Sequence, residues 1–340
     1  MKKILFLFTG KALYLGLTCI SAFALLFVFL GCNSPANPDP PPLLREAYTA
    51  KLRTFAPGAK LFVLTFDDGP SNVPGAPHTE NLLNALNNLN AGLTEDDPNY
   101  IKATMFLIGM RIDALDPILD TGINFIEKEK RKTERRALVQ RMLADGHEVA
   151  NHSYTHTYLG GGTFVDGIVE DGLSIYDIPD ISGIPELAKF KNRQWPLNKA
   201  EIANEIQECQ DTIQKAIYGD DNYKNFPYVS KFFRTPFTSI ENTTNLENAT
   251  AELNLPIIHG PSSDDYFSWH TPQEIADIIW RDRYEKISIN HDPVTGTKII
   301  DVLNIIIPRL KDEGWYFVTL SELDNHLDSK LIPGQIYVNF

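Results

Sequence analysis

Short apolar segments alternate with helical segments along most of this chain, and this alternation constrains the fold more than any other feature. Each apolar segment is four to six residues long and bounded by turn residues, which is typical of a buried strand. Strands separated by helices favour a parallel sheet, because parallel strands need a long crossover connection. The sequence therefore predicts an α/β fold in which helices wrap a parallel sheet that can close into a barrel. The predicted strands are Leu61–Phe66, Ala103–Ile108, Glu148–Asn151, Lys231–Arg234, Pro256–His259, Lys286–Asn290 and Trp315–Thr319.

The segments between these strands carry recognisable helix signals. Asn198 with Glu201 forms a capping-box pattern at the start of a helix that buries a stripe of isoleucines. Pro308 lies inside the apolar pattern of the last helix and is expected to kink or split it. Residues 157–195 do not follow the alternation of strand and helix segments and are expected to form a long insertion after the third strand. The charged residues 123–136 are interpreted as a solvated face.

Residues 1–31 are interpreted as a targeting segment rather than as part of the fold. A lysine-containing start precedes a long apolar stretch that ends in Phe29-Leu30-Gly31-Cys32. This ending resembles the lipobox of bacterial lipoproteins, in which the cysteine, here Cys32, is acylated and becomes the first mature residue. An uncleaved anchor is the alternative, because the stretch is long enough to span a bilayer. The Pro-rich tether in residues 32–59 favours the lipoprotein, and both interpretations place the globular part outside the cytoplasm, anchored to a membrane of the cell envelope.

Charge and cysteine content narrow the range of functions. The formal net charge is −13 at pH 7, which makes the chain a poor nucleic-acid binder through general electrostatics, so no nucleic-acid partner is expected. Of three cysteines, one lies in the targeting segment and Cys32 would carry lipid, so Cys209 has no partner for an intramolecular disulfide. Its place on an apolar helical face predicts a core position.

Side chains that could act as acids, bases or metal ligands lie just beyond the C-terminal ends of the predicted strands. In parallel α/β barrels the active site lies at that end, whatever the chemistry. The sequence therefore predicts one functional site assembled from several strand ends. Its candidate members are Asp67 and Asp68, His152 and His156, Arg234, Asp265 and Trp269, and His291.

His152 and His156 are four residues apart and would share one face of a helical turn, where both can reach one metal ion. Such a pair is common by chance and is more often structural when a third ligand is missing. Asp67 and Asp68 supply carboxylates from another strand end, although Asp-Gly-Pro chemistry alone would also fit an ordinary turn. Two histidines and a carboxylate leave an open position for water, as at a catalytic zinc, so we predict a metal site.

Three further side chains each have a functional and a structural interpretation. His291 is a natural acid–base group at a strand end, or a hydrogen-bonded structural histidine. Arg234 is expected to pair with one carboxylate and lower its pKa, or to form a surface ion pair of little consequence. Trp269 offers an aromatic platform of the kind on which sugar rings lie, or simply packs in a core.

Taken together, these motifs resemble the polysaccharide deacetylase family, which is the NodB-homology domain of carbohydrate esterase family 4. The match covers residues 60–325 and follows the order of the family's five motifs. The resemblance implies a NodB-like, distorted (β/α)7-type barrel as the catalytic domain, with residues 326–340 as a C-terminal tail. The matching segments are Thr65-Phe66-Asp67-Asp68-Gly69-Pro70, His152-Ser153-Tyr154-Thr155-His156, Arg234-Thr235-Pro236-Phe237, Asp265-Tyr266-Phe267-Ser268-Trp269 and Ile289-Asn290-His291.

The resemblance implies metal-dependent removal of acetyl groups from a polysaccharide. By position, Asp68, His152 and His156 would hold Zn²⁺ or another divalent ion such as Co²⁺. Asp67 would be the general base that takes a proton from water, and His291 the general acid that protonates the leaving group.

The remaining matched residues have supporting roles in the resemblance. Arg234 would orient Asp67, and Asp265 would orient His291. The backbone N–H of Phe237 would stabilise the oxyanion, and Pro236 and Trp269 would contact the substrate.

Three departures from the family pattern affect these expectations, one of which is the insertion at residues 157–195, because it directly follows the metal histidines and is expected to reshape the substrate groove. Phe237 replaces a tyrosine, which leaves the backbone role intact. Ser268 replaces the second aspartate of the fourth motif, so Asp265 or Asp264 would have to orient His291. The first expected substrate is N-acetylglucosamine in peptidoglycan or a chitin-like polymer, and acetylated xylan is the ester alternative. A non-catalytic glycan-binding lipoprotein and a hydrolase of non-sugar amides are the other hypotheses, and a monomer is expected.

Overall fold

The computed structural model describes residues 51–340 except 118, 121, 160–183, 185–186, 188–189, 191–195, 227–229, 239, 241–242, 293–297 and 339. The predicted signal peptide, Cys32, most of the tether and most of the insertion therefore lie outside the described residues. Within the described part, no helix combines the length and the apolar character needed to cross a membrane.

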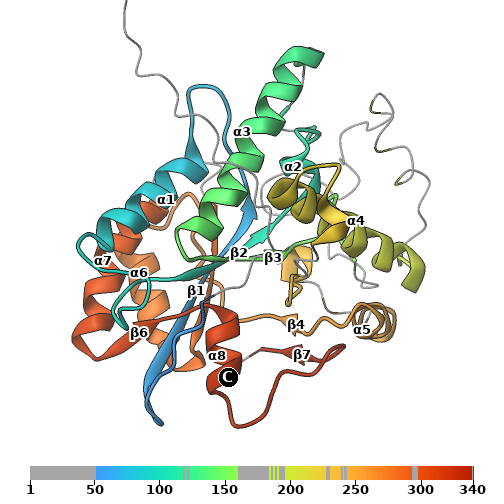
Figure 1. Cartoon of the computed structure of the whole chain (residues 1–340). Helices are drawn as coiled ribbons and strands as arrows, with labels where there is room; N and C mark the ends of the chain where they lie inside the picture. Colours follow the sequence, from blue (N-terminus) through green and yellow to red (C-terminus); the bar gives the residue numbers. More distant parts are fainter. Residues whose placement is uncertain are drawn as a thin grey trace, which may run out of the picture. The chain divides into compact units, whose positions relative to one another are not determined.

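A parallel sheet lies at the centre of the described domain, with β1 in its middle (Figure 1). β1 pairs with β2 and β5, β2 pairs with β3, and β6 pairs with the first residues of β1. β4 pairs with β7 in a separate two-stranded sheet. The bounds are β1 (Lys60–Gly69), β2 (Ala103–Leu107), β3 (Glu148–Asn151), β4 (Ile257–Ile258), β5 (Ile287–His291), β6 (Trp315–Phe317) and β7 (Ile336–Tyr337).

Single bridging residues link β3 to β5 and so close the sheet into a distorted barrel. Phe233 bridges to Asn151 of β3 and to Ile257 of β4, and Ser262 bridges to Ile289 of β5. The predicted α/β class with a parallel sheet is confirmed.

Two predicted strands are reduced most, and the predicted Trp315–Thr319 is also shortened, to Trp315–Phe317 of β6. Of Lys231–Arg234 only the bridge at Phe233 remains, and Pro256–His259 is reduced to the two residues of β4. Pro236, Pro256 and Pro261 lie close to these segments, and proline cannot donate to a longer ladder of hydrogen bonds.

Most of the helices cover one face of the sheet, and their caps follow the sequence signals. The Asn198 side chain accepts the N–H of Glu201 at 3.1 Å, and Glu201 accepts the N–H of Asn198 at 3.0 Å. Helix α7 continues through Pro308, so the predicted split does not occur; buried Ile307 and Leu310 hold the helix on both sides of the proline. The bounds are α1 (His78–Leu89), α2 (Gly109–Ile112), α3 (Phe125–Ala144), α4 (Lys199–Tyr218), α5 (Thr243–Glu252), α6 (Pro272–Arg281), α7 (Lys298–Asp312) and α8 (Leu320–His326).

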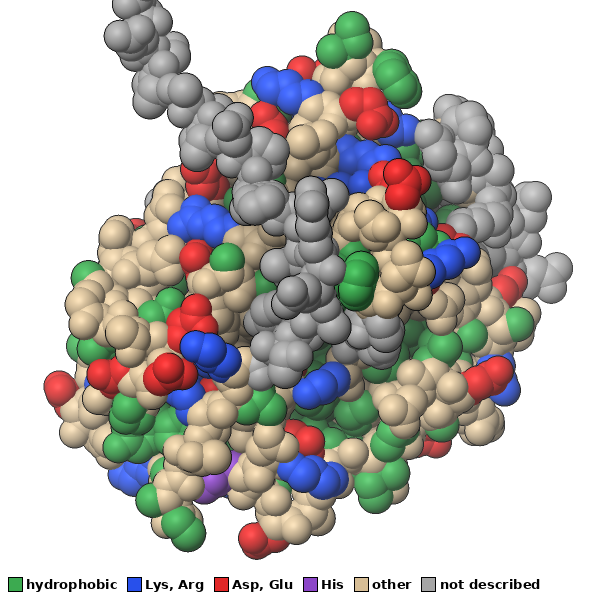
Figure 2. All heavy atoms as spheres, in the orientation of Figure 1, with side chains coloured by type: hydrophobic (Ala, Val, Ile, Leu, Met, Phe, Trp, Pro, Cys, Tyr) green, Lys and Arg blue, Asp and Glu red, His purple; other side chains and the backbone are tan. Residues whose placement is uncertain are grey.

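Helix α3 carries the charged segment predicted to be solvated. Figure 2 shows acidic and basic side chains interspersed over the displayed face, including the region of this helix. Arg135 is the exception, because its guanidinium is fully buried and pairs with Asp120 at 2.7 Å. The prediction of a solvated face therefore fails at this residue.

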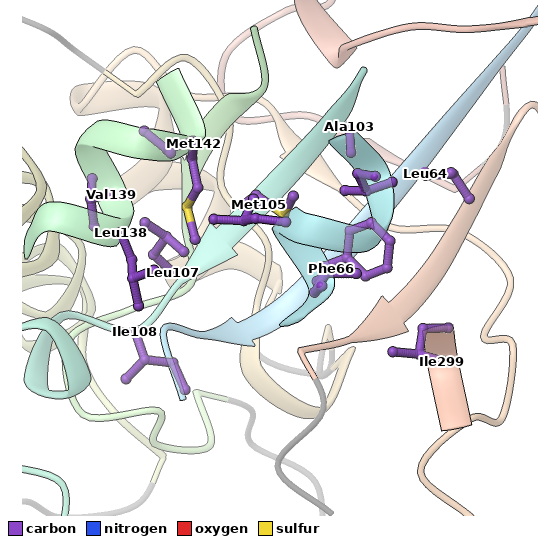
Figure 3. Close-up of a cluster of buried hydrophobic side chains, with 14 of the residues drawn as sticks. Leu64, Phe66, Ala103, Met105, Leu107, Ile108, Leu138, Val139, Met142 and Ile299 are labelled. Carbon is purple, nitrogen blue, oxygen red and sulfur yellow. The ribbon is translucent and has the colours of Figure 1, made fainter. Parts of the chain in front are cut away.

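Alternate residues of each strand face two different hydrophobic clusters, as the two-residue period of a strand requires. On the helical face, Leu64 and Phe66 of β1 and Met105 of β2 lie with Val139 and Met142 of α3 (Figure 3). The opposite face holds a second cluster, which α8 helps to cover. Its strand members include Leu61, Val63, Ala150, Phe232 and Ile287.

The packed domain extends beyond the predicted limits of residues 60–325 at both ends. Arg53 is buried and donates from Nε and Nη2 to the two carboxylate oxygens of Glu322, each at 2.9 Å. Lys102 Nζ lies 3.3 Å from the same carboxylate. Strand β7, in the segment predicted as a tail, pairs with β4. Parts of the predicted tether and tail therefore belong to the fold.

Candidate active site

Strand alternation delivers several polar side chains to one end of the sheet. The second hydrophobic cluster contains Val63, Ala150, Phe232 and Ile287. Counting onward in steps of two from these residues keeps the side chain on the same face. This counting reaches Thr65 and Asp67 on β1, His152 after β3, Arg234 after the bridge at Phe233, and His291 on β5. His291 is also the residue of β5 that pairs with Asp67.

Asp67 and Asp68 both reach this site although neighbours in a strand normally point to opposite faces. The register between β1 and β2 shifts between Phe66 and Gly69, and Asp68 has a left-handed backbone with φ 71°. Asp67 Oδ2 lies 3.8 Å from His152 Nε2, and Asp68 Oδ1 lies 3.4 Å from the same atom. Such irregularities are common beside active sites because they redirect a side chain.

The histidine pair converges on Asp68, but not from a helical turn. His156 Nε2 lies 3.0 Å from Asp68 Oδ1. Ser153 and His156 have φ angles of 68° and 52°, and residues 152–156 form a loop. The predicted local backbone was therefore wrong, while the predicted meeting of both imidazoles with a carboxylate is confirmed.

The protonation pattern of this cluster suits a divalent cation. His152 Nδ1 lies 2.9 Å from the carbonyl oxygen of Arg234, which only accepts, so Nδ1 carries a proton and Nε2 is the atom that faces Asp68. Burial lowers the pKa of His156 and favours its neutral form. Burial would raise the pKa of Asp68, but the imidazoles and Arg111 hold that pKa well below its usual value.

The geometry of the three ligand atoms fits the same cation. The ligand atoms of Asp68, His152 and His156 all lie within 4.8 Å of one another. Asp68 Oδ1 is buried without a well-oriented hydrogen-bond donor among the described residues. One carboxylate oxygen and two imidazole nitrogens are ligands that Zn²⁺ and similar ions accept, so the residues present fit the predicted metal.

Arg234 holds Asp67 in a buried ion pair. Its guanidinium is 0% exposed, and Nη1 donates to Asp67 Oδ1 at 2.6 Å and to Thr65 Oγ1 at 2.7 Å. The same group lies 4.1 Å from the centre of the Phe106 ring. The alternative of a weak surface pair is therefore excluded, because a desolvated pair of this geometry fixes both partners.

His291 is held by Asp265, which resolves the choice between Asp265 and Asp264. Asp265 Oδ1 lies 2.7 Å from His291 Nδ1, and Oδ2 accepts the backbone N–H of His291 at 2.8 Å. Burial would lower the pKa of His291, but the charge and hydrogen bond of Asp265, with the charges of Asp68 and Asp67, raise it to about 10. The orientation of His291 does not depend on residue 268.

Aromatic and proline side chains border the site. Phe237 has φ 57°, is 40% exposed and places its ring centre 4.7 Å from that of His156, one residue after the buried Pro236. Trp269 is 67% exposed and stacks on Phe267 with ring centres 4.3 Å apart, so it is not a core residue. Tyr266 meets His291 edge-on, with ring centres 5.4 Å apart.

Sequence reasoning missed three buried residues next to these groups. Arg111 donates to the backbone carbonyl of Asp68. The N–H of Asp292 donates to the carbonyl of Asp67 at 2.8 Å, and burial raises the pKa of the Asp292 carboxyl to about 6. Glu205 contacts the loop between the histidines. The sequence indicates Glu205 only by its position, because this acidic residue follows Ile202 by three residues and so lies on the apolar face of its helix.

Comparison with known proteins identifies the family of this chain. A family model described as polysaccharide deacetylase matches residues 56–256. A bifunctional xylanase/deacetylase of Pseudobutyrivibrio xylanivorans is 26% identical over 265 residues, which cover 78% of this chain and 30% of that protein. A peptidoglycan-N-acetylglucosamine deacetylase of Bacillus cereus is 24% identical over 268 residues, covering 76% of this chain and 66% of that protein. The present chain therefore matches only part of the length of each of these relatives.

A solved structure shares the fold. The family 4 acetyl xylan esterase of Clostridium thermocellum, in complex with a cobalt ion, is 24% identical and superposes with a TM-score of 0.54, covering 82% of this chain and 98% of that one. The family model spans more than half of the present sequence. The chain belongs to the polysaccharide deacetylase family.

Proposed function

We propose that this protein removes acetyl groups from a glycan by metal-dependent hydrolysis, and that N-acetyl groups of an N-acetylglucosamine polymer are its first substrate. One observation carries the proposal: the buried Asp67, held by Arg234, lies beside the Asp68–His152–His156 cluster. A carboxylate fixed next to a metal site is suited to take a proton from a water molecule that attacks a carbonyl carbon.

Different residues of the chain serve as metal ligands, general base and general acid in this reaction. A divalent ion held by Asp68, His152 and His156, with Zn²⁺ or Co²⁺ as candidates, would lower the pKa of water and polarise the acetyl carbonyl. Asp67 takes the proton of the attacking water. His291 donates a proton to the leaving nitrogen or oxygen.

Positioning groups complete the proposed site. Arg234 keeps Asp67 in place through the 2.6 Å ion pair, and Asp265 keeps Nε2 of His291 available by binding Nδ1. The backbone N–H of Phe237, in the turn after Pro236, serves the oxyanion. Pro236 and Trp269 border the bound sugar.

Acetate release tests the proposal. The purified protein is stripped of metal, reloaded with Zn²⁺ or Co²⁺, and incubated with N-acetylglucosamine oligomers, peptidoglycan and acetylated xylan, with His152→Ala as the control. We expect metal-dependent release from the N-acetylated polymers that the variant lacks. Release from acetylated xylan alone would replace the amide with an ester substrate. Metal binding and glycan retention without any release would favour the glycan-binding alternative.

The pH dependence of activity reports the pairing of His291 with Asp265. His291 acts in its protonated form, so kcat/KM falls as pH rises through its pKa. Asp265→Asn removes the negative charge that raises this pKa, so we expect the alkaline fall in kcat/KM to move about 1–3 pH units lower. An unchanged alkaline limb in the variant, measured from pH 6 to 11 with metal in excess, would show that another group is the acid.

Trp269 is predicted to bind a sugar ring beyond the reacting residue. Trp269→Ala is expected to raise KM for N-acetylglucosamine oligomers about five- to tenfold, because loss of one aromatic contact costs about 1–1.4 kcal/mol. The kcat for a small acetyl ester that is too short to reach Trp269 is expected to stay unchanged. Equal effects on both substrates would contradict a platform role.

We further propose that residues 1–31 are a signal peptide, that Cys32 is lipidated, and that residues 32–59 connect the lipid to an extracytoplasmic catalytic domain. The lipobox-like Phe29-Leu30-Gly31-Cys32 supports this proposal. Mass spectrometry of the mature N-terminus tests it: a diacylated Cys32 is expected, and an intact Met1-containing terminus would contradict it.

A further inference from the structure

We propose that Glu205 is a positioning residue that holds the loop carrying both histidine ligands in its metal-binding shape. The inference rests on the proposed metal site and adds a residue that the five sequence motifs leave out. Glu205 lies in α4, is 0% exposed and is flanked by the buried Ile206. A carboxylate in such surroundings is costly unless hydrogen bonds satisfy it, so its partners indicate its purpose.

Three hydrogen bonds connect this carboxylate to the segment between His152 and His156. Oε2 of Glu205 accepts the backbone N–H of Tyr154 at 2.9 Å and that of Thr155 at 2.8 Å. Oε1 accepts the Thr155 hydroxyl at 2.5 Å. One side chain from a helix thus satisfies two successive backbone donors and one hydroxyl in the segment that joins the ligands.

The loop needs such a partner because its backbone is not regular. Ser153 and His156 occupy the left-handed region, which is costly for residues other than glycine. Because the loop is not helical, its successive N–H groups do not form the hydrogen bonds that a helix would provide. Glu205 supplies an acceptor for two of them.

The opposite side of the loop is held by α2. The N–H of Gly109 donates to the carbonyl of Ser153 at 3.1 Å, and the N–H of Met110 donates to that of Tyr154 at 2.9 Å. The loop is thus fixed on both sides, because its carbonyl groups accept N–H donors of α2 and its N–H groups donate to Glu205. Removing one side frees the segment whose shape sets the distance between the two imidazoles.

Glu205→Gln is the direct test, because glutamine keeps the size but replaces one acceptor oxygen by an NH₂ donor. The remaining oxygen can accept from Tyr154 and Thr155 N–H, but the NH₂ then replaces the Oε1 that accepts the Thr155 hydroxyl, and both backbone hydrogen bonds lose the charge of the carboxylate. Groups that orient metal ligands typically change metal affinity about 10–100-fold when mutated. We expect a loss of Co²⁺ affinity in this range, measured on the metal-stripped full chain by calorimetry and by the visible spectrum of bound Co²⁺.

Glu148→Gln is the matched control. Glu148 is also buried and accepts three hydrogen bonds, from Ser321 N–H at 3.1 Å, Ser321 Oγ at 2.5 Å and Thr104 Oγ1 at 3.1 Å. It lies at the start of β3, whereas the histidine loop follows the end of that strand. Urea unfolding of the metal-free proteins is expected to show a loss of stability in both variants, with a loss of Co²⁺ affinity only in Glu205→Gln.

The outcomes separate this inference from the proposed function. Wild-type Co²⁺ affinity in Glu205→Gln, or an equal loss in Glu148→Gln, overturns the inference and leaves the metal site intact. Failure of the wild type to bind Co²⁺ overturns both. If Glu205→Gln does not fold, Thr155→Val removes only the hydroxyl contact and is expected to weaken Co²⁺ binding several-fold; wild-type affinity there also overturns the inference.

Discussion

Asp67→Asn is expected to reduce acetate release by about 10²–10⁴-fold, the contribution of a positioned general base. Asparagine retains the shape of the side chain and an oxygen that can accept from Arg234, but it cannot take a proton from water. Asp67 Oδ1 is occupied by Arg234 at 2.6 Å, and Asp68 is the carboxylate that lies nearest both histidines. Metal affinity is therefore expected to stay close to the wild-type value.

Steady-state kinetics with metal in excess, together with Co²⁺ titration, measures both quantities. Asp68→Asn is the contrasting variant, because it is expected to lose metal affinity as well as activity. Near-wild-type acetate release by metal-loaded Asp67→Asn would assign the proton transfer to another group. Loss of metal affinity in both variants would make the two carboxylates joint ligands.

Glu322→Gln is expected to lower the free energy of unfolding by about 3–5 kcal/mol, because it leaves buried cations without their counter-charge. Arg53 and Lys102 both contact this carboxylate, at 2.9 and 3.3 Å, and all three side chains are buried. Glutamine can still accept the N–H of Thr319, so the cap of α8 is preserved. Urea unfolding monitored by tryptophan fluorescence measures the difference.

Asp96→Asn serves as the control for charge alone. Asp96 pairs with Lys51 at 3.9 Å, and both side chains are largely exposed, so its loss is expected to cost at most about 1 kcal/mol. A change of that size in Glu322→Gln as well would mean that the buried cluster contributes little to the fold.

Features that depend on local periodicity could be predicted from the sequence. The apolar runs ending at Phe66, Asn151 and Asn290 indicated parallel strands, and parallel strand ends meet at one edge. That argument placed Asp67, Asp68, His152, His156 and His291 at the same end of the predicted sheet. The helix cap at Asn198 was equally local, because a capping box is complete within four residues.

Features that depend on distant partners could not be predicted. Arg53 and Glu322 are 269 residues apart, and no local pattern relates them. The left-handed backbones of Asp68 and His156 are imposed by surrounding contacts, since residues other than glycine rarely adopt that conformation. The role of Glu205 could not be predicted, because a polar residue on the apolar face of a helix indicates neither its hydrogen-bond partners nor its function.

The central place of β1 has a consequence for how the polypeptide is made. Its edge toward β5 binds residues that follow far later, as in the hydrogen bond from Thr65 to Ser288 across 223 positions. At about 5–20 residues per second, a ribosome needs on the order of ten seconds or more to supply that partner. Until then an apolar strand edge is open to pairing with other chains. During synthesis the nascent protein therefore depends on whatever shields that edge.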